Sequence, residues 1–128
     1  MSSLEDFEDR LHGVLSEIDG ALEERFGSRW PLHPARPPRG AAANPQYDGL
    51  FRVTASFSAG YGSKFGPGYV FRVEASTLAS VPESERAAIE DEAAGLLREG
   101  LARAFPGRDL RVDRDVAGYK IHGDLSLA

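Results

Sequence analysis

Two segments in which apolar and polar residues alternate constrain the fold of this chain most strongly. Their apolar positions are Phe51, Val53, Ala55 and Phe57 in the first segment and Tyr69, Phe71, Val73 and Ala75 in the second. Alternation with a period of two is typical of β-strands that bury one face and expose the other. Residues 59–68 connect the two segments and are rich in glycine. The pattern predicts a hairpin over residues 48–76 with a glycine-rich loop at its tip, and its apolar face requires a cover.

Two amphipathic segments, residues 1–26 and 81–105, are predicted to be helices that supply this cover. The apolar stripe of the first segment consists of Leu4, Phe7, Leu11, Val14, Leu15, Ile18, Ala21, Leu22 and Phe26. This spacing is that of one helix face, and Ser2 with Glu5 fits a capping box at its start. The stripe packs either within the chain or against the same helix of a second copy. Gly100 lies on or near the second stripe, where it would let a neighbouring element approach closely.

Residues 27–47 and 109–122 complete the order of elements. The first range contains five prolines, which fix φ and remove backbone donors, so we expect an extended connector without regular helix. The second range alternates around a turn and predicts a C-terminal pair of strands. The order α-β-β-α-β-β predicts an α+β fold in one domain of 128 residues. Its architecture would be a two-layer sandwich, with two helices on one face of a mainly antiparallel sheet of about four strands.

The composition excludes several classes of protein. The chain has no cysteine, so disulfides, thiolate metal sites and cysteine nucleophiles are absent. Its first residues are acidic and no apolar run follows them, which predicts a cytoplasmic protein without a membrane segment. The net charge of −5 disfavours indiscriminate nucleic-acid binding.

No motif in the sequence predicts a catalytic residue, a metal site or a cofactor. The glycines of residues 60–66 are off by one from the G-x-G-x-x-G spacing of phosphate-covering loops, and no Gly-Lys-Ser/Thr occurs. Residues 113–124 resemble the spacing of an EF-hand loop, but Ala117 stands where calcium needs an oxygen ligand. The three histidines show no metal-ligand spacing.

A diffuse set of polar residues forms the candidate binding surface. The set is Arg52, Arg72, Arg111, Lys120 and His122 on the polar phase of predicted strands, with Tyr61, Lys64 and Phe65 in the glycine-rich loop. Such a face could bind phosphates through charge-assisted contacts. Glu74 and Asp113 share the strand phase, so a solvated surface of mixed charge is the alternative. The loop itself is either a flexible hairpin tip or a binding loop.

These observations predict a binding domain rather than an enzyme. The first hypothesis is a homo-oligomer or an adaptor for a protein partner. The alternative is a domain that binds nucleic acid or a phosphate ligand through the basic strand positions and the loop. An enzyme without a recognisable motif is the third hypothesis.

Overall fold

The computed structural model describes residues 3–116 and 118–125. Its elements are α1 (Ser3–Phe26), the 3-10 helix η1 (Pro45–Tyr47), β1 (Phe51–Ser58), β2 (Gly68–Ala75), α2 (Glu83–Ala104), β3 (Leu110–Asp115) and β4 (Gly118–Gly123). The predicted order of helices and strands is confirmed. Ser2, predicted to cap the first helix, and Ala117, the mismatched position of the EF-hand spacing, lie outside the described residues.

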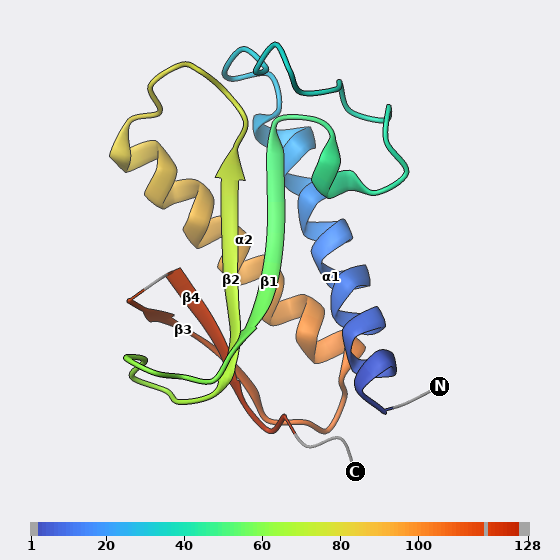
Figure 1. Ribbon diagram of the computed structural model, residues 1–128, viewed down its shortest axis with the longest axis vertical. Coiled ribbons are helices and arrows are strands. Elements are labelled where there is room, and N and C mark those ends of the chain that lie inside the picture. The colour runs from blue at the N-terminus through green and yellow to red at the C-terminus, as the bar shows by residue number, and fades with distance from the viewer. Residues whose placement is uncertain (1–2, 117, 126–128) are drawn as a thin grey trace.

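The four strands form one antiparallel sheet in the order β1-β2-β4-β3. Both helices lie behind this sheet, on the same face, and the opposite face is left without a helix (Figure 1). The α+β two-layer architecture predicted from the sequence is therefore confirmed. None of the described helices combines the length and the apolar character that crossing a bilayer requires.

The core lies between the two layers. Its members are Phe7, Leu11, Val14, Leu15, Ile18, Leu22, Leu50, Phe51, Val53, Tyr69, Phe71, Ile89, Ala93, Ala94, Leu97, Leu101, Phe105, Val112, Tyr119 and Ile121. Most of the α1 stripe is thus packed within the chain, whereas Leu4 is exposed. Gly100 of α2 faces Val14 of α1 so closely that an added Cβ would lie 2.6 Å from Val14 Cγ1. This confirms that Gly100 permits a close approach of a neighbouring element.

Phe57 departs from the predicted alternation. The sequence places its ring on the buried face, but 63% of its surface is exposed. β1 is an edge strand, and its last residues diverge from α1 (Figure 1). The ring of Phe57 therefore packs edge-on against Tyr69, at 5.7 Å between centroids. The helical layer leaves this ring uncovered.

The proline-rich connector follows a defined path without regular helix, apart from the short η1. Arg36 holds it by donating hydrogen bonds to the carbonyl oxygens of Gln46 (2.6 Å), Asp48 (3.0 Å), Gly49 (3.0 Å) and Phe51 (3.1 Å). Turn carbonyls that lack partners in a sheet or helix are thus satisfied by one side chain. The connector is therefore fixed at the start of β1.

Candidate functional site

The strand residues of the predicted binding surface lie on one face of the sheet. Strand alternation places Arg52, Arg72, Arg111, Lys120 and His122 on the face opposite the helices. The period-two pattern was sufficient to predict this common face, because successive side chains of a strand point to opposite sides.

Acidic side chains share this face. Glu74 is in register with Arg52, and Asp113 is in register with Lys120. His122 Nε2 also lies 2.7 Å from Asp113 Oδ2. The face therefore carries mixed charge, as in the alternative weighed from the sequence, and basic and acidic residues alternate across it.

The glycine-rich loop folds back over β3 and β4 (Figure 1). The Ser63 hydroxyl donates a hydrogen bond to the Asp115 carboxylate, and the Lys64 N–H donates to the same group at 3.2 Å. The Phe65 ring stacks on the imidazole of His122, with 4.4 Å between centroids. The loop is thus attached to the sheet at two places, so it is not a free hairpin tip.

Lys120 lies on the open face of the sheet but is only 1% exposed. A Cβ added to Gly68 would lie 2.9 Å from Lys120 Cε, so the lysine stem packs directly against the start of β2. The hydrogen bond from Ser63 lowers the pKa of Asp115, and the charge of Lys120 contributes in the same direction. Lys120 therefore does not belong to the exposed surface that the sequence predicted. Tyr61, in the first half of the loop, is 97% exposed.

A second feature was not predicted: among the described residues, part of β2 has no paired strand on one side. β4 pairs with β2 only from Tyr69 to Phe71. The N–H of Ser76 donates to Leu50 O at 2.6 Å. This bond shows which residues of β2 point their backbone groups toward β1: every second one, counted back from Ser76. In an antiparallel ladder the backbone groups of alternate residues point to opposite sides. The N–H and C=O groups of Val73 and Ala75 therefore point away from β1, and within the described residues no strand pairs with them. We call this unpaired edge, residues 73–75, the notch.

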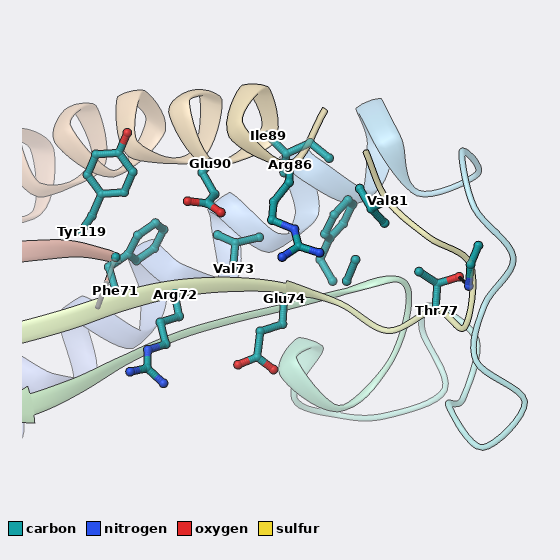
Figure 2. Close-up of a pocket in the computed structure, with 14 residues that line it drawn as sticks. Phe71, Arg72, Val73, Glu74, Thr77, Val81, Arg86, Ile89, Glu90 and Tyr119 are labelled. Carbon is teal, nitrogen blue, oxygen red and sulfur yellow. Dashed lines mark hydrogen bonds between the residues drawn. The ribbon is translucent and has the colours of Figure 1, made fainter. Parts of the chain in front are cut away.

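A groove of about 470 Å³ lies beside the notch, between β2 and α2. Its apolar wall includes the buried rings of Phe51 and Phe71 and the buried side chain of Ile89, with Val73 and Val81 at its sides. Val73 and Phe71 point toward α2, whereas the neighbouring Arg72 and Glu74 point away from it (Figure 2). A strand added at the notch would thus direct every second side chain into this groove.

Four charged side chains border the groove. Arg72 and Glu74 stand on the open face of the sheet, and Arg86 and Glu90 extend from α2 (Figure 2). Within the described part of the chain, none of these four side chains has a hydrogen bond or an ion pair. The charge of Glu90 helps to raise the pKa of Arg114, so Arg72, Glu74 and Arg86 are the charges left to orient a ligand beside this apolar groove.

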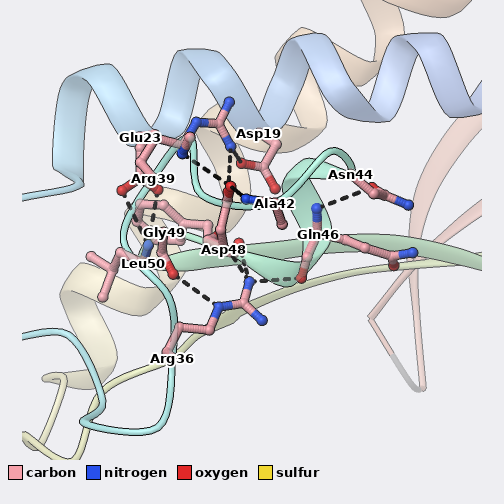
Figure 3. A network of polar contacts seen from close by, with 12 residues as sticks. Asp19, Glu23, Arg36, Arg39, Ala42, Asn44, Gln46, Asp48, Gly49 and Leu50 are labelled. Atoms are coloured by element: carbon pink, nitrogen blue, oxygen red, sulfur yellow. Dashed lines mark hydrogen bonds and ion pairs between the residues drawn. The ribbon is translucent and has the colours of Figure 1, made fainter.

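A polar network between α1 and the connector is the other cluster of charged groups (Figure 3). Arg39 lies 2.6 Å from an Asp19 carboxylate oxygen and 3.6 Å from Asp48. Asp48 accepts hydrogen bonds from the N–H groups of Gly40 (3.0 Å) and Ala42 (2.9 Å). The carboxylates therefore hold the connector in place.

Burial raises the pKa of Asp19 to about 6, although the charge of Arg39 opposes this shift. One oxygen of this carboxyl group has no hydrogen-bond partner among the described residues. The group borders a second cavity of about 270 Å³, next to Arg52 of β1. Because Asp19 bonds to a residue of the connector, we assign it a structural role.

Neither cluster resembles a metal centre, since the described residues contain no group of three His, Asp or Glu side chains placed to hold an ion. The residues that form the notch were missed by sequence reasoning. Val73 and Ala75 were assigned to a strand, but their free edge depends on where β4 ends against β2. The only signal was the difference in length between the predicted hairpin and the C-terminal strand pair.

Comparison with known proteins shows one extended relationship. The chain is 41% identical over 123 residues to an "Uncharacterized protein" of Borreliella burgdorferi (strain ATCC 35210 / DSM 4680 / CIP 102532 / B31), and the match covers 96% of each chain. No solved structure matches the chain. Residues 2–123 match the model of a family described as "Uncharacterised protein". The chain belongs to this family.

Proposed function

We propose that this protein is an interaction domain that binds an extended segment of a partner protein by adding it to the sheet as a strand at the notch. The observation that carries this proposal is the coincidence of unpaired backbone groups at Val73 and Ala75 with an apolar groove beside them. In strand addition the main chain supplies hydrogen bonds, and alternate side chains enter pockets. The cytoplasmic location expected from the sequence remains part of the proposal and is tested by cell fractionation.

The ends of the notch limit the length of the added strand. Gly118 lies beside Phe71 and Arg72, because a Cβ added to it would stand 3.1 Å from Phe71 O and 4.0 Å from Arg72 Cγ. At the other end, the chain leaves the sheet at Ser76, whose carbonyl accepts a hydrogen bond from His33 at 2.8 Å. The notch therefore accepts about three residues in direct pairing, which suits a short segment.

A second copy of this chain is a poorer occupant than a different segment. The register that keeps clear of Gly118 would pair Val73 with the second copy's Ala75 and would place the two Glu74 side chains opposite each other. Like charges directly opposite in a sheet are destabilising. The homo-oligomer hypothesis is therefore an outcome of the test, and a partner segment is the proposed ligand.

The test selects ligands from a phage-displayed library of random nonapeptides and measures their affinity for three forms of the protein. Val73→Pro removes the outward N–H, which β1 does not use, so the variant is expected to fold. Val73→Thr keeps the N–H and a similar shape. We expect Val73→Pro to weaken the binding of selected peptides about tenfold, as for loss of one edge hydrogen bond, and Val73→Thr to retain binding.

Circular dichroism and thermal unfolding establish that both variants are folded. Equal binding by wild type and Val73→Pro would contradict strand addition. A dimer by light scattering that Val73→Pro dissociates would replace the partner segment with a second copy.

Nucleic-acid binding is the alternative function. Arg52, Arg72 and Arg111 on one face support it, but acidic residues lie among them and Lys120 is covered. Titration with RNA and DNA oligomers at low salt tests this alternative, because phosphate contacts are strongest there. The proposed function predicts no binding under these conditions.

A further inference from the structure

We infer that the segment bound at the notch carries an apolar–basic–apolar triplet, with its basic side chain opposite Glu74. This inference rests on the proposed function and specifies the chemistry of the partner. It follows from the alternation of side chains along the notch and from the charges on its two faces.

The apolar positions come from the geometry of the edge. Partner residues that lie across from Val73 and Ala75 share the face of these two residues, because paired residues of a sheet point to the same side. Val73 points toward α2, into the groove walled by Phe71 and Ile89 (Figure 2). Apolar side chains at these two partner positions would cover the apolar wall of the groove. Both surfaces would then be transferred out of water, which is favourable for apolar groups.

The basic position comes from Glu74. The partner residue between the two apolar ones lies on the open face, directly across from Glu74. The Glu74 carboxylate has Arg52 in register on β1 but forms no ion pair with it or with any other described residue. A lysine or arginine in the added strand would place a second cation on the vacant side of Glu74. Opposite charges in directly paired positions stabilise a sheet, and like charges destabilise it.

The residue next to Glu74 on the same face, Arg72, does not specify a second charged position in the partner. Arg72, two residues back on the same face, has Gly118 beside it, so no partner side chain would lie directly across from this arginine. Its charge acts only along the diagonal, where cross-strand pairs are farther apart. The residue opposite Glu74 is thus the one partner position on the open face that faces a charge of the notch directly.

Three capped pentapeptides test the inference: Thr-Val-Lys-Val-Thr and its variants with Gln or Glu in place of Lys. The core is symmetric, so a parallel or an antiparallel orientation places the same residues on the same faces. Affinities are measured by NMR titration of the full chain at low salt. We expect the Lys peptide to bind about fivefold more tightly than the Glu peptide, with the Gln peptide between them.

Charge reversal supplies the decisive comparison. Glu74→Lys should invert the order, so that the Glu peptide binds most tightly, and Glu74→Gln should abolish the preference. The matched control is Arg72→Gln, a change of charge on the same face of the same strand, which should leave the order of the peptides unchanged.

Two results separate the inference from the proposed function. Equal affinity of the three peptides, together with loss of all binding in Val73→Pro, would overturn the basic triplet and leave strand addition standing. Binding that Val73→Pro does not change would contradict strand addition itself.

Discussion

Phe71 of β2 is in register with Tyr119 of β4, and among the described residues this pair is the last one that the two strands share. β2 continues through Ala75, while β1 accompanies it on the other side to Phe51. Unpaired edges attract other chains, so proteins usually shorten or cover them. Here the edge runs beside an apolar groove between β2 and α2. The proposed function rests on this difference: β2 continues to Ala75, whereas its pairing with β4 ends at Phe71.

The crossing of α1 and α2 predicts opposite effects for two glycines of α2. Gly100→Ala would place a methyl group 2.6 Å from Val14 Cγ1, a stiff β-branched side chain, and we expect a net loss of stability of about 1–3 kcal/mol. Gly95 has no atom within 4 Å of an added Cβ. Gly95→Ala should therefore gain up to about 1 kcal/mol from helix propensity. Urea unfolding measures both values, and a stabilising Gly100→Ala would contradict the close crossing.

Two phenylalanines on neighbouring strands should respond differently to truncation. Phe71 is 1% exposed and Phe57 is 63% exposed. We expect Phe71→Ala to lower the free energy of unfolding by about 3–5 kcal/mol, because it removes a buried ring and leaves a cavity. Phe57→Ala should lower it by less than about 1 kcal/mol, since little apolar surface is lost. Similar losses in the two variants would mean that the end of β1 is buried.

Asp19 predicts a pH dependence of stability. Its pKa in the folded protein is about 6, above the ordinary value of 3.8, so the folded state holds this proton more tightly than the unfolded state. The stabilising contribution is therefore full below about pH 4 and is lost as the pH rises through about 6. We expect the difference in stability between wild type and Asp19→Asn to fall over this interval. A constant or rising difference in chemical denaturation would contradict burial of this carboxyl group.

The attachment of the glycine-rich loop can be tested by proteolysis. The chain has lysine only at positions 64 and 120, and Lys120 is buried, so a lysine-specific protease should cut the folded protein at Lys64 alone. Asp115→Asn weakens the contacts with Ser63 and Lys64 and should accelerate this cleavage several-fold.

Asp109→Asn is the matched control for this experiment. Asp109 pairs with Arg111 at 2.9 Å and has no hydrogen bond or ion pair with a described residue of the loop. Its substitution should leave the cleavage rate unchanged. Equal rates in wild type and Asp115→Asn would indicate a loop that is not held by the sheet.

Local patterns were sufficient to predict the fold, because each describes one element and the face that it buries. Period-two and helical spacing predicted the order of elements and the closeness of Gly100 to its neighbour. Phe57 fitted the alternation but lies beyond the helical cover, whose extent is set by tertiary packing. The alternation of residues within one strand does not show which of them the helices cover.

The site depended on relationships that are distant in the sequence. The phase of β4 placed Lys120 on the correct face, yet Gly68, against which its stem packs, is more than fifty residues earlier in the chain. Within residues 3–116 and 118–125, the pairing of β4 with β2 ends at Tyr119 and Phe71, and this end defines the notch. Strand order and register are long-range properties, so alternation alone could not reveal the free edge.

Amide hydrogen exchange of Val73 and Ala75, followed by NMR with and without a selected peptide, tests the central claim most directly. Arg72 and Glu74 are internal controls, because their amides point toward β1. In the free protein, Val73 and Ala75 should exchange fast while the two controls are protected, and the peptide should slow exchange at Val73 and Ala75 alone. Strong protection of Val73 and Ala75 before any peptide is added, or no change on binding, would contradict strand addition at the notch.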